Sequence, residues 1–404
     1  MGKFKKVLGV MGLALCFSLA SKVDSQAAGK LTGIKQVDAS TYSVKVSVDA
    51  DLGTEYYTLE LRNASDNNWV VLDKSSSADN LYSSSLSAGK SYYARVRGYA
   101  DYDCTQPTTE YSDELEVVTV PDTTNMKAVQ SGATTNGFSV KYSGVSGANT
   151  YFMTYNDEII GKSSNSTVKT SKKLSAAKGY WVNAYAARKS KSGYMAYSKY
   201  GYDYCNLKTL TNAVGSKSFG VSSAYQNIDV YYFSVNVSGD CDGTHLQFAT
   251  PSGKVKKNLY DTTSYRVADF INGNFYKYRV RTYVNCGSKK VFSKWSGYHY
   301  IGVAKNVKGE SKKSSYKSKY KTIYLDWSKI NYACGYDVYI SNRENAGYKK
   351  VKSVSAKNRK LTITKYGKSK LKASSTYYIK IVPKAKVGKK TVSSSIYHVL
   401  KSYY

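Results

Sequence analysis

The sequence predicts an all-β chain built as a tandem array of four immunoglobulin-like sandwiches. Composition favours strands, because the 404 residues include 42 Tyr and only 4 Pro, and no stretch has a long helical period. A repeat supports the count of four: a large apolar residue is followed six positions later by Tyr and ten positions later by a smaller apolar residue. The Tyr of the four copies stand at 92, 180, 276 and 377. Intervals of 88, 96 and 101 residues between them match the length of one small β-sandwich.

The first element is an export signal, predicted over residues 1–28. Three lysines lie within the first six residues, an apolar run covers residues 7–20, and Ala27 and Ala28 offer a small-residue cleavage site. The apolar run is shorter than the roughly 20 residues that a membrane-spanning helix needs, and we expect no transmembrane segment. The protein is therefore expected to be secreted, and to be extracellular or associated with the cell surface.

The repeated tyrosines are predicted to be structural corners between two strands. At such a corner the ring is buried and the hydroxyl bonds to the backbone upstream, so that no buried polar atom is left unpaired. After each corner, residues alternate between core and surface with period two. The four predicted corners are Tyr92, Tyr180, Tyr276 and Tyr377.

Four sandwiches follow the signal, and they differ in charge. The predicted boundaries are 29–122, 123–211, 212–303 and 304–404. Residues 30–122 carry 8 basic and 15 acidic side chains, whereas residues 304–404 carry 25 and 4. The first sandwich is thus acidic and the fourth strongly basic, in a chain with a formal net charge of +32.

The fourth repeat resembles the tandem fibronectin type III domains of secreted bacterial proteins. The resemblance rests on these residues in order: Leu325, Trp327, Gly335, Tyr336, Asp337, Val338, Tyr339, Ile340, Gly347, Tyr348 and Tyr377. The other repeats keep the corner but place Val48, Tyr142 or Val237 where the strand Trp is expected, and the second and third diverge most. The resemblance implies β-sandwich modules with an accessory role, since such repeats commonly accompany adhesion or carbohydrate-active domains.

Cysteine use suggests one disulfide. Cys241 and Cys286 are expected in loops at the same end of the third sandwich, and we predict that they pair. Two free thiols are the alternative, because connectivity does not follow from sequence alone. Cys104, Cys205 and Cys334 have no obvious partners, but in a head-to-tail array Cys205 would approach the same junction, so an exchange with Cys205 is a further alternative.

The basic fourth sandwich is the most suggestive functional feature. A field of this sign attracts polyanions, and for an exported protein these are an anionic cell-wall polymer or an acidic glycan. Lys384, Lys386, Lys389 and Lys390 fall in a predicted hairpin, a favoured position for recognition. The alternative is a solvated, Lys-rich surface that only keeps the domain soluble.

Basic and aromatic side chains also alternate on predicted strand surfaces. Arg279, Arg281, Lys380 and Trp181 are outward-facing candidates for ionic contact with an anionic polymer or for stacking against sugars. Cross-strand stabilisation of the sheet is the other interpretation.

Catalysis is not expected. The three histidines form no zinc spacing or catalytic triad, and no phosphate loop or nucleophile elbow is present, so we predict no enzyme, no cofactor and no metal. The sequence predicts a binding or adhesion array that recognises no specific nucleic acid. Its partners could also include other surface proteins. A passive spacer or scaffold and a neutral-carbohydrate-binding module are the alternative functions.

Overall fold

The computed structural model describes residues 29–199, 202–215, 218–223, 230–261, 263–396 and 398–402. The predicted signal peptide lies outside these residues. The elements named within these residues are all strands, so the predicted all-β class is confirmed. Within the described residues there is no helix that is long and apolar enough to cross a membrane.

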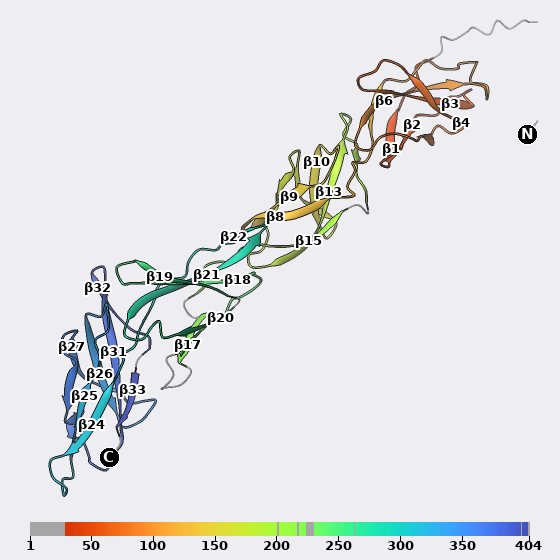
Figure 1. The fold of residues 1–404 in the computed structure, drawn as a ribbon. Coiled ribbons are helices and arrows are strands. Elements are labelled where there is room, and N and C mark those ends of the chain that lie inside the picture. Colours follow the sequence, from red (N-terminus) through yellow and green to blue (C-terminus); the bar gives the residue numbers. More distant parts are fainter. Residues whose placement is uncertain are drawn as a thin grey trace, which may run out of the picture. The chain divides into compact units, whose positions relative to one another are not determined.

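The strands form pairs of facing sheets, which we number in chain order (Figure 1). Sheet pair 1 has a three-stranded sheet of order β1-β2-β5 and a four-stranded sheet of order β4-β3-β6-β7. This is the strand order of an immunoglobulin-like sandwich. Its strands are β1 (Lys35–Ala39), β2 (Val44–Ser47), β3 (Tyr56–Asn63), β4 (Val70–Ser75), β5 (Leu81–Ser83), β6 (Ser91–Tyr99) and β7 (Leu115–Val118).

Sheet pair 2 repeats this plan with sheets β12-β9-β8 and β11-β10-β13-β14, and β15 also pairs with β13. Its strands are β8 (Lys127–Thr134), β9 (Gly137–Ser143), β10 (Thr150–Tyr155), β11 (Glu158–Ser163), β12 (Thr167–Lys169), β13 (Gly179–Lys189), β14 (Met195–Ala196) and β15 (Asp203–Lys208).

Sheet pair 3 has the orders β16-β17-β20 and β19-β18-β21-β22, with β23 also on β21. Its strands are β16 (Phe219–Ser223), β17 (Val230–Val235), β18 (Gly243–Ala249), β19 (Val255–Asp261), β20 (Ser264–Ala268), β21 (Phe275–Cys286), β22 (Lys289–Phe292) and β23 (His299–Gly302).

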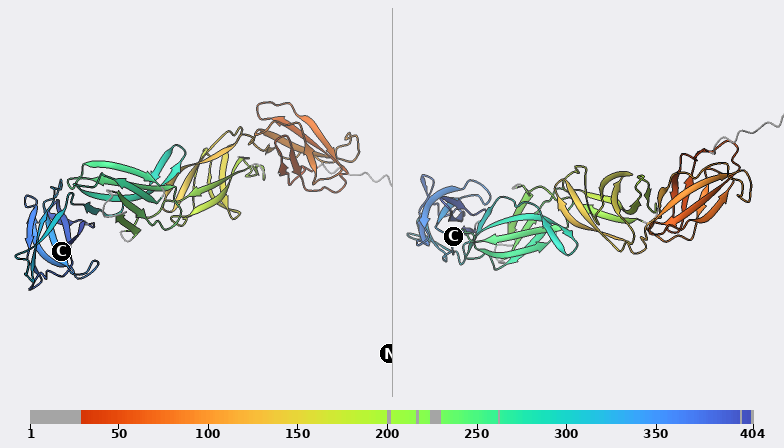
Figure 2. Two further views of the ribbon diagram at one scale, coloured as in Figure 1. Left: turned by 60° about the horizontal axis from the view of Figure 1, so that its bottom comes forward. Right: turned by 90° about the horizontal axis from the view of Figure 1, so that it is seen from above.

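Sheet pair 4 has the orders β24-β25-β28 and β27-β26-β31-β32, with β33 also on β31 and a separate β29-β30 ribbon. Figure 2 shows the paired sheets from two further directions. The strands are β24 (Lys308–Lys313), β25 (Lys321–Asp326), β26 (Gly335–Ser341), β27 (Lys349–Ser355), β28 (Lys360–Ile363), β29 (Lys365–Tyr366), β30 (Ser369–Lys370), β31 (Tyr377–Val387), β32 (Lys390–Ser393) and β33 (His398–Ser402).

Each sheet pair encloses its own apolar core. In sheet pair 4, Ile323 and Leu325 from one sheet share a buried cluster with Val338 and Ile379 from the other. The central strands alternate buried and half-buried residues, as on β31, because successive side chains of a strand point to opposite faces. The strand parity predicted from the sequence is therefore observed.

Three of the repeated tyrosines make the expected corner. The backbone N–H of Ser87 donates to the Tyr92 hydroxyl at 2.9 Å, that of Ser175 to Tyr180 at 2.8 Å, and that of Lys372 to Tyr377 at 3.0 Å. Each donor lies five residues before its tyrosine. Tyr276 differs, because its ring is buried against Phe270 in a parallel stack with centroids 4.6 Å apart, and the described residues give its hydroxyl no such bond.

The chain divides into two compact units. One comprises the described residues up to Val120 together with Lys189–Ala196, and the other comprises Pro121–Arg188 and the residues from Tyr197 onward. The four-domain boundaries near residues 122, 211 and 303 stay predictions, since only the division next to Val120 coincides with one of them.

Candidate functional site

The three-stranded sheet of sheet pair 4 carries a basic groove that the sequence does not reveal. Two adjoining hollows, of about 750 Å³ and 710 Å³, share Lys308, Asp326 and Lys360 in their walls. We call the charged side chains and the exposed tyrosine of this lining the basic groove. It consists of Lys308, Glu310, Lys312, Tyr324, Asp326, Lys357, Arg359 and Lys360.

Strand register builds this groove from segments that are distant in sequence. Lys308 on β24 lies opposite Asp326 on β25, and Asp326 lies opposite Lys360 on β28. The next outward row is Glu310, Tyr324 and Thr362. Because alternate residues of a strand share one face, both rows line the solvent side of the sheet.

The groove has a positive balance of five basic to two acidic side chains. Lys312 pairs with Glu310 at 3.0 Å, and Lys360 lies 3.9 Å from Asp326. Both pairs are more than half exposed, so each contributes little to stability. An anionic ligand can therefore displace the carboxylate from either lysine. Tyr324 is 45% exposed, and the Lys312 ammonium lies 5.8 Å from the centroid of its ring.

The predicted lysine hairpin lies on the other sheet of the pair. Lys386 and Lys390 are exposed beside the turn that Gly388 and Lys389 make between β31 and β32. Gly388 has φ +59°, a left-handed conformation that glycine adopts without strain. Lys384 is different, because it pairs with Asp337 at 2.6 Å and is only 20% exposed. The four lysines therefore do not form one free cluster.

Asp337 is held ionised by a small network. Burial raises the pKa of its carboxyl, but hydrogen bonds from Lys384, Ser353 and Lys350 outweigh burial and leave the pKa below its ordinary value of 3.8. A depressed carboxylate pKa gives stability that is present above the unfolded-state pKa and is lost as the pH falls through the folded-state pKa.

Asp337→Asn is expected to lower the free energy of unfolding by about 1–3 kcal/mol at neutral pH, since charge-assisted hydrogen bonds are lost. The deficit should shrink at acidic pH, as the pH falls through the folded-state pKa and the native carboxylate also becomes protonated. Urea denaturation at both pH values measures this. Asp326→Asn is the matched control, because its side chain is 53% exposed, and it should change stability little. A deficit that is equal at both pH values would contradict the network.

The predicted Arg279 and Arg281 are stacked on rings and do not form an open ionic surface. Arg279 lies over Trp295 at 4.1 Å and donates to Gln247 at 2.8 and 3.0 Å. Arg281 lies over Phe292 at 3.7 Å and Trp295 at 4.2 Å. Burial lowers the pKa of His245. The Arg281 Nε–H donates a hydrogen bond to the His245 Nδ1, with 3.2 Å between the two nitrogens. Much of each guanidinium is thus used within the sheet.

Serine hydroxyls hold this stack in place. The Ser293 hydroxyl accepts the backbone N–H of Thr282 at 3.0 Å, and that of Ser296 accepts the N–H of Val280 at 2.9 Å. The two bonds fix the segment that carries Trp295 along the edge of β21. The pattern Ser293-Lys294-Trp295-Ser296 is the sequence signal that accompanies this arrangement.

Sheet pair 1 has a similar stack. Arg95 lies between Trp69 and Tyr111, at 4.3 and 3.8 Å from their ring centroids. The Glu60 carboxylate accepts from Arg95 at 2.7 and 2.8 Å and from the Tyr111 hydroxyl at 2.8 Å. Sequence parity predicts that Arg95 faces outward, but it does not show that rings cover it.

The remaining predicted surface residues differ in exposure. Lys380 lies 3.6 Å from the centroid of the Tyr348 ring, on the sheet opposite the basic groove. Trp181 is 55% exposed and stacks on Tyr204. The candidates therefore occupy several separate surfaces.

The predicted disulfide between Cys241 and Cys286 is not formed. Both are free thiols, as are Cys104, Cys205 and Cys334. The physical reason is that β21 continues through Cys286 and buries its side chain with Leu210 and Val284, whereas Cys241 is half-buried in the turn before β18.

Burial raises the pKa of Cys286 to about 11, and burial with the nearby Asp203 raises that of Cys205 to about 12. At pH 8 we expect about one thiol in a thousand or fewer to be ionised at these positions, so iodoacetamide should modify the native chain slowly there. Peptide mass mapping without reductant checks both points. A linked Cys241–Cys286 peptide would contradict the structure.

Among the residues that the structure covers, no group of three His, Cys, Asp or Glu side chains is placed to hold a metal ion.

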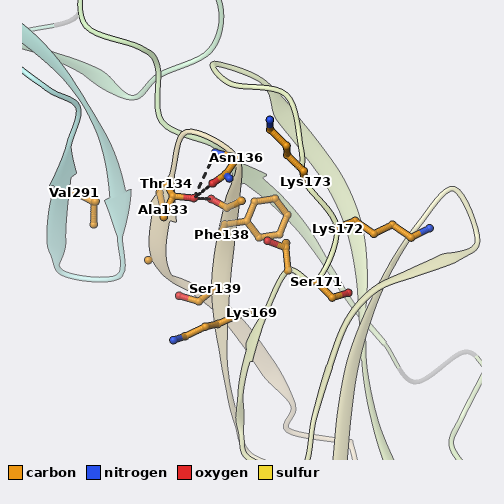
Figure 3. A pocket seen from close by; sticks show the side chains of 13 residues that line it. Ala133, Thr134, Asn136, Phe138, Ser139, Lys169, Ser171, Lys172, Lys173 and Val291 are labelled. Atoms are coloured by element: carbon orange, nitrogen blue, oxygen red, sulfur yellow. Dashed lines mark hydrogen bonds between the residues drawn. The ribbon is translucent and has the colours of Figure 1, made fainter.

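A further hollow of about 520 Å³ lies at the end of sheet pair 2, next to Val291 of β22. Lys169, Lys172 and Lys173 surround it, but Figure 3 shows their ammonium groups at separate edges of the hollow. Lys172 also pairs with Glu158 at 2.6 Å. The lysines therefore do not converge on one anion.

Comparison with solved structures finds tandem fibronectin type III arrays. The FN1–FN3 domains of chicken CNTN1 are 13% identical, with 92% of this chain and 99% of that chain covered and a TM-score of 0.19. A two-domain segment of chicken tenascin is 17% identical over 46% and 97% of the two chains, with a TM-score of 0.20. The central array of RIM-binding protein is 10% identical over 67% and 97%, also with a TM-score of 0.20.

No protein-family model matches the chain, and no curated protein does. Sequence identity and TM-score are both low for these solved structures. The evidence for the sandwich architecture is therefore the strand order and register of the chain itself.

Proposed function

We propose that the chain is a non-catalytic bacterial binding array, secreted or held at the cell surface, whose basic C-terminal sheet pair attaches it to an anionic cell-wall polymer or an acidic glycan. The basic groove carries this proposal. Five cationic side chains and one exposed ring line adjoining hollows on a rigid sheet. Cations with stackable rings suit a polymer of charged repeating units.

The charge distribution supports the same assignment. Residues 304–404 have a formal net charge of +21, from 25 basic and 4 acidic side chains, whereas residues 30–122 have −7, from 8 and 15. A field of this strength draws polyanions toward the basic end before any specific contact forms. In the groove, several cationic side chains can then contact neighbouring charges of one polymer at the same time.

The test compares two triple variants that remove the same number of charges. Lys308→Ala, Arg359→Ala and Lys360→Ala together alter the groove, and the matched control changes Lys386, Lys389 and Lys390 to Ala. With poly(glycerol phosphate) and hyaluronate as probes, the groove variant should bind roughly ten- to a hundredfold more weakly than the native chain. Each exposed ionic contact contributes roughly 0.5–1 kcal/mol.

The control should keep most of the affinity. An equal loss in both variants would show that bulk charge, and not the groove, holds the polymer. If both variants bound the probes as tightly as the native chain, these basic residues of sheet pair 4 would not hold the polymer, and the proposal would be wrong.

A further inference from the structure

A second surface, on sheet pair 2, has a different chemistry from the basic groove. The outward side of β13 carries Trp181, Asn183 and Tyr185, and the neighbouring β15 carries Tyr204 and Asn206. Trp181 and Tyr204 stack nearly in parallel, with ring centroids 5.1 Å apart and planes at 16°. They are 55% and 58% exposed, so a large aromatic surface is open to solvent.

The aromatic surface extends along the sheet. Tyr202, which is 42% exposed, lies 5.4 Å from Tyr185 between ring centroids. Tyr185 in turn stacks on the buried Phe152 at 4.9 Å with planes at 13°. This contact with a buried ring limits the motion of Tyr185, and rigid aromatic contacts lose little conformational entropy when a ligand binds.

Counted from the corner tyrosine, the positions equivalent to Trp181 are Tyr93 in sheet pair 1 and Lys277 in sheet pair 3. Arg62 lies 4.5 Å from the centroid of the Tyr93 ring, and Lys277 lies 4.5 Å from the centroid of the Tyr298 ring. The positions equivalent to Asn183 are Arg95 and Arg279, which stack on Trp69 and Trp295. In the part of sheet pair 2 that the structure describes, no Lys or Arg lies over Trp181 or Tyr204. Exposed aromatic patches of this kind mark interaction sites, whereas the covered stacks stabilise their own sheets.

We propose that Trp181, Tyr204, Tyr202 and Tyr185 form an aromatic platform on which a neutral polysaccharide stacks. The polar positions among the rings are Asn183 and Asn206, which carry no charge. A sugar ring presents C–H groups to an aromatic face and hydroxyls to amides, whereas a polyanion would gain no ionic contact here. Carboxamides supply both donors and acceptors for hydroxyls.

This inference does not depend on the basic groove. It concerns another sheet pair and a ligand without charge, and binding of this kind is not weakened by screening. High salt therefore separates the two activities in one full-length chain.

The test is retention of the purified full chain on insoluble cellulose, chitin, xylan and mannan in about 0.5 M NaCl, where ionic contacts are largely screened. We expect at least one of the four polysaccharides to retain the native chain. Trp181→Ala combined with Tyr204→Ala should weaken that binding at least about tenfold, as loss of a Trp or Tyr anchor does at other interfaces. Trp181→Phe should retain part of the affinity.

Tyr232→Ala and Tyr42→Ala are matched controls, since these tyrosines are 42% and 57% exposed in other sheet pairs. Both should bind like the native chain, and so should the triple groove variant at this salt concentration. Because Trp181 and Tyr204 are exposed, their removal should change stability by no more than about 0.5 kcal/mol, which a urea titration verifies.

Failure of the native chain to bind any of the four polysaccharides would overturn the proposal. Equal loss in the tyrosine controls would also overturn it. If the platform instead joined two copies of the chain, size-exclusion chromatography would show an oligomer that the Trp181 and Tyr204 changes dissociate, without polysaccharide retention.

Discussion

Trp327→Ala is expected to lower the free energy of unfolding of sheet pair 4 by about 3–5 kcal/mol, the range found when a buried Trp or Phe is truncated. Trp327 is 2% exposed and packs edge-on against Tyr336, with ring centroids 5.4 Å apart. It belongs to the buried cluster that joins the two sheets. Truncation leaves a cavity that the surrounding strands can fill only in part.

Hydrogen exchange of peptides from β25 and β31 measures this change locally, which matters because a chain of several cores does not unfold in one step. Trp327→Phe should cost less, since the indole Nε1–H of Trp327 is buried and has no hydrogen-bond partner among the described residues, and its loss removes an unfavourable group. Tyr316→Ala is the control at a residue that is 97% exposed. Equal exchange in Trp327→Ala and in this control would contradict the core assignment.

Glu60→Ala is expected to destabilise sheet pair 1 by roughly 2–3 kcal/mol. Breaking a fully buried ion pair costs about 3–5 kcal/mol. We expect a smaller loss for Glu60→Ala because the Arg95 side chain is 25% exposed. Glu60 itself is 8% exposed at its side chain and accepts hydrogen bonds from Arg95 and Tyr111. Its removal leaves the Arg95 guanidinium between two rings without its counter-charge.

Exchange of β3 and β6 peptides reports this loss. Glu60→Gln should fall between the native chain and Glu60→Ala, because the amide oxygen still accepts a hydrogen bond. Glu114→Ala is the matched control: it also removes a carboxylate that pairs with an arginine, but that carboxylate is 48% exposed. A Glu60→Ala chain as stable as the Glu114→Ala control would show that the stack does not stabilise the sheet.

The fold could be predicted because its signals are local. The spacing of Leu371, Tyr377 and Ile381 encodes a corner and the start of an alternating strand, and both lie where the sequence places them. Register shifts and the ribbon of β29 and β30 depend on contacts between distant segments, and no local pattern indicates them.

The sites were only partly predictable for the same reason. Clustering in sequence drew attention to Lys384 and Lys386, yet Asp337 engages the first of them. The basic groove joins Lys308 and Lys360, which are 52 positions apart in sequence and lie on either side of β25. Parity identified Arg279 as outward-facing, but the serine bonds that bring Trp295 over it became visible only in three dimensions.

Salt dependence of binding by the full chain to poly(glycerol phosphate) tests the central claim most directly. Between about 50 mM and 500 mM NaCl, the logarithm of the association constant should fall linearly with the logarithm of salt concentration, because bound counterions are released when lysines meet phosphates. The Lys308, Arg359 and Lys360 triple variant should show a slope that is shallower by about two to three. Binding that does not change with salt, or no binding at the lowest salt concentration, would contradict the account.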